Sequence, residues 1–140
     1  MSVSVAPTHV LLGFAELALE HAVSGVMNTE GPLFPFLLTG DRDGTRALFR
    51  YDMSPVDAVR LAQEKVNGDA SLLLYAFAAD GYLTTGGHRL PAVIVHAGER
   101  GERAAFVFAQ RFAHDRTPKF SALAGAPETI DATASWFPPA

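Results

Sequence analysis

The chain has 140 residues, an apolar fraction of 49% and a formal net charge of −4 at pH 7, which together fit one globular domain with a sizeable core. The acidic balance argues against binding along a nucleic-acid backbone, which requires a basic surface. The lack of cysteine excludes disulfides, thiolate catalysis and zinc–thiolate sites. No apolar run approaches the roughly 20 residues of a membrane helix. We therefore expect a cytoplasmic protein without a nucleic-acid or membrane partner, and the preference for arginine over lysine is typical of a GC-rich bacterial genome.

The segment from Thr8 to Met27 predicts a first helix, which the Thr8 side chain can cap. Apolar residues cover most of its circumference and leave a narrow polar stripe. A helix of this kind must be buried on more than one side. We expect its second side to be covered either by the rest of the domain or by another subunit.

Residues 33–39 and 45–51 predict a hairpin, because the segment between them is rich in glycine and aspartate. Pro35 cannot donate a ladder hydrogen bond, which indicates an edge position or a bulge. The run from Asp41 to Gly44 resembles the start of a calcium loop. The bidentate acid that would complete such a loop is missing, so we interpret the run as a turn.

A second helix begins after Ser54, the predicted N-cap, with Pro55 in its first turn and Asp57 complementing the helix dipole. Asn67 and Gly68 end this helix. Three strands follow between Ser71 and Phe112, joined by glycine-marked turns.

The order is therefore helix, strand, strand, helix and three strands, α-β-β-α-β-β-β. Short turns pair neighbouring strands antiparallel. We predict a two-layer α+β domain over residues 1–113, with a mainly antiparallel five-stranded sheet and both helices on one face. Residues 114–140 predict an extended C-terminal tail packed on the domain or on a partner through apolar anchors, which are Phe120, Ile130, Trp136 and Phe137.

The sequence contains no phosphate-binding loop, no nucleophile elbow and no histidine pair at metal-ligand spacing, so we predict no cofactor and no metal. His96 lies in a predicted central strand, where a half-buried imidazole can act as a base, although a packed histidine is the preferred interpretation. Arg100, Arg111 and His88 are the other candidate binding residues. For Arg100, a solvated turn with compensating charges is the preferred interpretation.

We expect a non-enzymatic association or regulatory domain that acts as a homodimer or binds another protein. The alternative is a small-molecule (anion) binding protein or hydrolase with a pocket near His96 and Arg111. The apolar first helix and the apolar tail anchors favour association.

Overall fold

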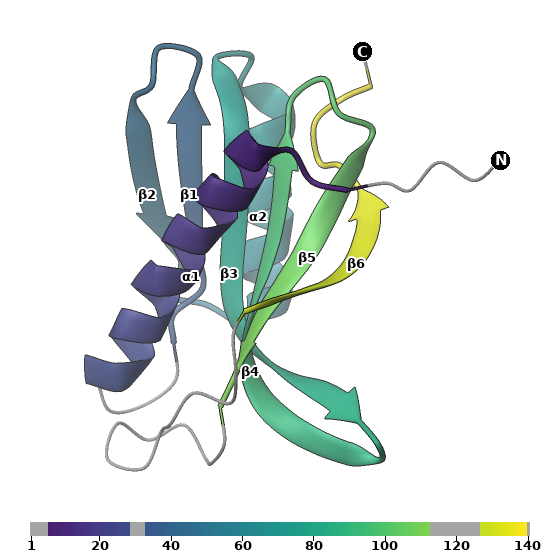
Figure 1. Cartoon of the computed structure of the whole chain (residues 1–140). Helices are drawn as coiled ribbons and strands as arrows, with labels where there is room; N and C mark the ends of the chain where they lie inside the picture. The colour runs from purple at the N-terminus through teal and green to yellow at the C-terminus, as the bar shows by residue number, and fades with distance from the viewer. Residues whose placement is uncertain (1–5, 29–32, 113–126, 140) are drawn as a thin grey trace, which may run out of the picture.

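The computed structural model describes residues 6–28, 33–112 and 127–139. Their regular structure consists of two helices and six strands: α1 (His9–Asn28), β1 (Phe36–Asp41), β2 (Arg46–Arg50), α2 (Pro55–Gly68), β3 (Leu72–Thr85), β4 (His88–Glu99), β5 (Ala104–Arg111) and β6 (Glu128–Ala134). The strands form one antiparallel sheet in the order β2-β1-β3-β4-β5-β6 (Figure 1). The predicted α+β class and antiparallel sheet are confirmed.

The prediction of five strands is wrong, because β6 adds a sixth within the segment interpreted as a tail. It pairs antiparallel with β5, Ala104 opposite Ala134. All but the first of its residues are exposed, so its sequence lacks the apolar alternation by which a strand is recognised. Residues 114–126 of the predicted tail, including Phe120, lie outside the described part of the chain.

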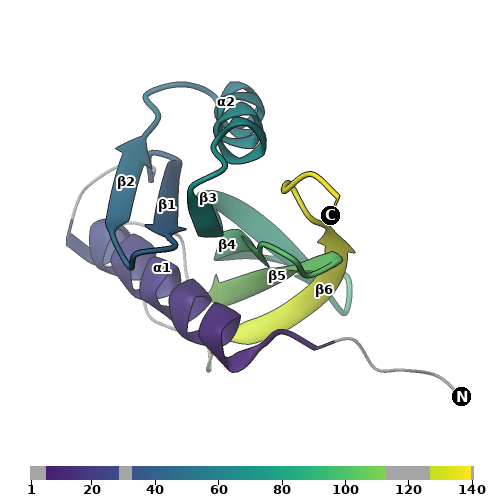
Figure 2. The ribbon, with the colours of Figure 1, turned by 90° about the horizontal axis from the view of Figure 1, so that it is seen from above.

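The two-layer arrangement with both helices on one face is also wrong, since α1 and α2 lie on opposite faces of the sheet (Figure 2). Ala76 and Ala78 of β3 contact the core beneath α1, whereas Tyr75 and Phe77 contact the core beneath α2. Successive side chains of a strand point to opposite faces. Because β3 is apolar at both sets of positions, its pattern does not reveal which face a helix covers.

The first helix is covered by the sheet along one side only. Leu11, Phe14 and Ala18 are buried against the strands, while Glu16 and Glu20 are exposed. Thr8 caps α1 as predicted, because its Oγ1 accepts the N–H of Leu11 at 3.1 Å. Neither helix in the described residues is long and apolar enough to cross a membrane.

The turn of the first hairpin and the start of the second helix lie where the sequence predicts them, although β1 begins at Phe36 and not at residue 33. Gly44 has a φ of 89°, which suits the β1–β2 turn. Ser54 Oγ accepts the N–H of Asp57 at 3.3 Å and caps α2. Neither the edge position nor the bulge predicted at Pro35 is present: β1 lies between β2 and β3, its register shift falls at Gly40 and Asp41, and Pro35 precedes the strand.

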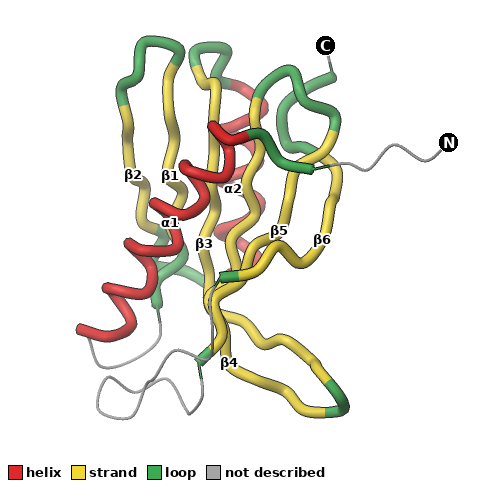
Figure 3. Tube along the Cα trace, viewed as in Figure 1, coloured by secondary structure: helices red, strands yellow, loops and turns green. Residues whose placement is uncertain are grey.

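The far ends of β3 and β4 project as a long hairpin beyond the other strands (Figure 3).

Candidate functional site

Three nearly parallel rings form an aromatic cluster on the α2 face of the sheet. Trp136, just after β6, lies over His96 of β4 with centroids 4.4 Å apart and planes at 16°. The same indole lies over Tyr75 of β3 at 5.0 Å and 6°. Phe137 meets Tyr75 edge-on at 5.2 Å. Ring pairs in these geometries add stabilisation beyond their area, so the cluster attaches the C-terminal segment to the middle of the sheet.

Tyr75 is fully buried, and burial raises the pKa of its hydroxyl to about 12. Its oxygen accepts the backbone N–H of Trp136 at 3.1 Å. The ring lies across β4 at Gly98, its partner in the strand register. A Cβ at Gly98 would lie 2.5 Å from Cε1 of the ring, so this position requires glycine.

His96 is held neutral by its surroundings. Burial lowers its pKa to about 4, and a hydrogen bond to the backbone of Ala134 opposes this effect only in part. A general base that works near neutral pH needs a pKa close to that pH. The position of His96 within the aromatic cluster matches the packed histidine preferred from the sequence.

A cleft of about 750 Å³ lies between α2 and the segment around Trp136. Polar side chains of α2 form one wall, and their spacing of three, four and seven residues places them on one helical face. His96, Trp136 and residues 133–135 form the rest. The helix wall consists of Arg60, Gln63, Glu64, Asn67 and Gly68.

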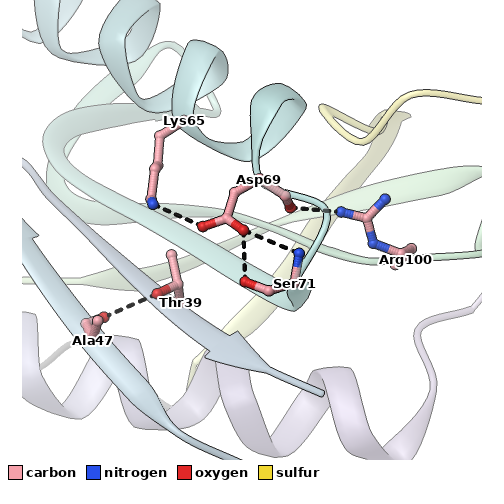
Figure 4. A network of polar contacts seen from close by, with 6 residues as sticks. All are labelled: Thr39, Ala47, Lys65, Asp69, Ser71 and Arg100. Atoms are coloured by element: carbon pink, nitrogen blue, oxygen red, sulfur yellow. Dashed lines mark hydrogen bonds and ion pairs between the residues drawn. The ribbon is translucent and has the colours of Figure 1, made fainter. Parts of the chain in front are cut away.

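Arg100 ties the loop after α2 to the C-terminal segment. Its Nη2 donates to the carbonyl of Asp69 at 2.9 Å and its Nε to the carbonyl of Leu72 at 2.6 Å, and the first of these bonds is drawn in Figure 4. The guanidinium lies 4.4 Å from the ring centroid of Phe137. In the same loop, hydrogen bonds from Lys65 and Ser71 hold the pKa of the Asp69 carboxyl well below its usual value. The guanidinium of Arg100 is therefore engaged by the protein's own backbone.

The other two candidates lie away from the cleft. Arg111 is opposite Ala92 in the β4–β5 register, and its Nε pairs with Oε1 of Glu128 at 2.5 Å. His88 opens β4 opposite Thr85 at the end of the long hairpin, and its side chain lies outside the described part. Of the three candidates whose side chains the structure describes, His96 alone lines the cleft. The other wall of the cleft is the polar face of α2. The spacing of Arg60, Gln63, Glu64 and Asn67 in the sequence is the signal that could have indicated it.

A second surface stands out at the edge of the sheet. All five residues of β2 are exposed, and its strand partner among the described residues is β1 (Figure 1). Exposed large apolar side chains lie on β2, with Leu48 and Phe49 on opposite faces of the sheet, in the segment that follows it, and at Phe34, whose ring lies against Arg50 of β2. We call β2 with these neighbours the β2 surface; its apolar members are Phe34, Leu48, Phe49, Met53 and Val56.

Cations cover parts of this surface. The guanidinium of Arg50 lies 5.4 Å from the ring centroid of Phe34, and Lys65 Nζ lies 5.4 Å from that of Phe49. Phe49 nevertheless keeps 38% of its surface exposed. Contiguous exposed apolar surface marks association sites more often than isolated apolar residues do, and Phe49 with Leu48 places apolar side chains on both faces of this edge.

Comparisons with protein-family models, with curated proteins and with solved structures found no match to this chain. Within the ranges that the structure describes, no three histidine, aspartate or glutamate side chains gather where they could hold a metal ion.

Proposed function

We propose that the protein is a non-enzymatic association module that forms a homodimer through the β2 surface. The observation that carries this proposal is the exposure of β2, an edge strand with no second partner strand among the described residues, whose apolar side chains Leu48 and Phe49 keep 37% and 38% of their surface exposed. An exposed edge strand is a template for pairing with another chain, and short length, charge, bulges or a covering segment oppose such pairing. β2 is short and carries Arg46 and Arg50, but its ladder with β1 is regular and no other described strand pairs with it.

The state of the candidate polar groups supports association over catalysis. The guanidinium of Arg100 is bonded to backbone carbonyls, and that of Arg111 is paired with Glu128. Burial holds His96 neutral with a lowered pKa. These groups hold the C-terminal segment to the sheet, which is a structural role.

Multi-angle light scattering across a concentration series tests the proposal. The wild-type chain is expected to give the mass of two chains at micromolar concentration. Phe49→Glu places a charge on the β2 surface and is expected to shift the mass to one chain. Ile130→Glu is the matched control, since Ile130 has a similar exposed fraction of 41% on β6, at the other edge of the sheet. A wild-type mass of one chain at tens of micromolar would overturn the proposal.

The second candidate function is small-molecule binding in the cleft beside Trp136. The observation that favours it is an exposed polar helix face opposite a wall that includes two stacked rings, His96 and Trp136. Such a site suits a planar molecule with polar or anionic substituents, for which Arg60 supplies the positive charge.

Thermal-shift screening of anionic and aromatic metabolites tests this second candidate, because a ligand that prefers the native state raises the Tm. A true ligand should also change the fluorescence of Trp136, the only tryptophan in the sequence. The rise in Tm that the ligand causes should be smaller in Arg60→Ala. It should persist in the control Arg42→Ala, which changes a residue in the exposed β1–β2 turn. A broad panel without any shift would argue against the site.

A further inference from the structure

The hydrogen bonds of β2 show which of its backbone groups are directed outward. The N–H of Tyr51 donates to Pro35 at 2.9 Å, and the carbonyl of Thr45 accepts from Asp41 at 2.8 Å. Residues with odd numbers therefore direct their backbone groups toward β1. Because successive residues alternate in an antiparallel ladder, Arg46, Leu48 and Arg50 direct their N–H and C=O groups to the open edge.

We propose that two copies of the chain pair antiparallel along β2 with Phe49 opposite Phe49, so that their two sheets become continuous. This inference rests on the proposed function and adds the geometry of the dimer. The symmetric pairing is isologous and closes at two chains.

Alternation of the backbone groups restricts the register. In a symmetric pair, residues that face each other must both direct their backbone groups outward or both inward, so the two-fold axis passes through one residue. Two registers keep Leu48 and Phe49 in contact: one is centred on Leu48 and the other on Phe49. Centring on Leu48 places Arg46 opposite Arg50 twice, and like charges opposite each other destabilise a strand pair. Centring on Phe49 places Arg46 opposite Asp52 twice. Charge complementarity therefore selects the Phe49 register.

Side-chain packing favours the same register. Phe49 directs its backbone toward β1, so the Phe49 pair is not hydrogen-bonded and its Cα atoms approach to about 4.5 Å. Two half-exposed phenylalanine rings then meet on the α2 face. The flanking pairs place Leu48 opposite Arg50, whose aliphatic stem can cover it. Asp52 lies two residues beyond the end of β2, and the hydrogen bond from Tyr51 to Pro35 continues the β1–β2 ladder to the residue before it.

Other contacts at the sheet edges fit less well. Centring on Ala47 places Arg50 opposite Gly44, where a φ of 89° ends the strand in a turn. The opposite edge strand β6 carries acidic residues, but the β5–β6 register shifts at Val107 and Phe108. Such a bulge disfavours further pairing, whereas the β1–β2 pairing is regular. Pairing β2 with β6 would also leave open ends and build a filament.

Charge reversal tests the register by the sign of its effect. In the Phe49 register, Arg46→Glu places a carboxylate opposite Asp52 twice and is expected to raise the dimer Kd roughly tenfold. Asp52→Arg should also raise it, and the double variant should restore it. In the Leu48 register, Arg46→Glu instead relieves a repulsion and lowers the Kd, an outcome that would overturn the proposed register.

Single-cysteine scanning gives an independent test, because the natural chain contains no cysteine. Ala47→Cys, Leu48→Cys, Phe49→Cys and the control Ile130→Cys are oxidised with oxidised glutathione, and the rate of disulfide-linked dimer formation is measured. Facing residues of a non-hydrogen-bonded pair have the Cβ separation that a disulfide needs, so Phe49→Cys should react fastest. If Ala47→Cys or Leu48→Cys forms the disulfide-linked dimer fastest, the proposed Phe49 register is wrong. If Ile130→Cys forms it fastest, the proposal that the dimer pairs along β2 is wrong. A monomeric wild type overturns the proposed function itself.

Discussion

Trp136 lies parallel to Tyr75, with ring centroids 5.0 Å apart and planes at 6°, and its backbone N–H donates to the Tyr75 hydroxyl at 3.1 Å. One buried side chain thus provides both a stacking surface and a hydrogen-bond acceptor for the segment after β6. The C-terminal segment is therefore part of the hydrophobic core beneath α2, together with residues of α2 and β3.

Tyr75→Phe keeps the stacking and removes the acceptor. The N–H of Trp136 then loses its partner in a half-buried position, and we expect the free energy of unfolding to fall by about 1 to 2 kcal/mol. Urea unfolding followed by Trp136 fluorescence measures the change. Tyr82→Phe is the control, because Tyr82 is 56% exposed and should have an effect below about 0.5 kcal/mol. Equal effects of the two substitutions would contradict the role of the Tyr75 hydroxyl.

Gly98→Ala tests the close approach of Tyr75 to β4. Its Cβ would lie 2.5 Å from Cε1 of Tyr75, so the ring or the strand must move, and overpacking of this kind costs about 1 to 3 kcal/mol. Gly13→Ala is the matched control, since no other side chain lies within 4 Å of its Cβ and α1 should gain up to about 1 kcal/mol. Thermal unfolding should therefore move Tm in opposite directions for the two variants. A Gly98→Ala protein as stable as the wild type would show that the ring has room to shift.

Local signals in the sequence predicted most elements, because caps, turns and apolar runs are properties of neighbouring residues. Ser54 and Pro55 mark the start of α2, and Gly44 marks a turn. The placement of α1 and α2 on opposite faces depends on contacts between distant segments. β3 carries apolar residues toward both faces, so its pattern fits either arrangement.

The candidate site was less predictable than the fold. His96 could be singled out as a polar residue within an apolar strand, but its ring partner Trp136 comes from a segment without strand periodicity. Arg100 and Arg111 were candidates because free guanidinium groups bind anions. Their partners Asp69 and Glu128 are 31 and 17 residues away, and such pairing follows from the tertiary fold alone.

Arg100→Lys tests the attachment of the loop after α2. Lysine keeps the charge but cannot reproduce the two guanidinium bonds to the carbonyls of Asp69 and Leu72. We expect a loss of about 1 to 3 kcal/mol in the free energy of unfolding. Arg103→Lys is the control, because Arg103 is exposed in the same β4–β5 turn. If both variants unfold at the same urea concentration as the wild type, the two bonds of Arg100 contribute nothing measurable.

The lowered pKa of His96 predicts a pH dependence with a definite sign. The ring has a pKa of about 4 when folded and about 6.5 when unfolded. Between these values the unfolded chain binds a proton that the folded chain does not, so stability falls as the pH is lowered through this window. We expect a loss of about 3 kcal/mol from pH 7 to pH 4.

His96→Phe should remove most of this slope, since phenylalanine keeps the aromatic packing against Trp136 and cannot bind a proton. The lowered pKa values of Asp43 and Asp69 act in a different window, because those carboxyls stabilise the fold above the unfolded pKa near 4 and lose that contribution at lower pH. Urea unfolding at half-unit steps from pH 4 to pH 7.5 separates the two effects. A slope between pH 5 and 6.5 that persists in His96→Phe would assign it to another histidine.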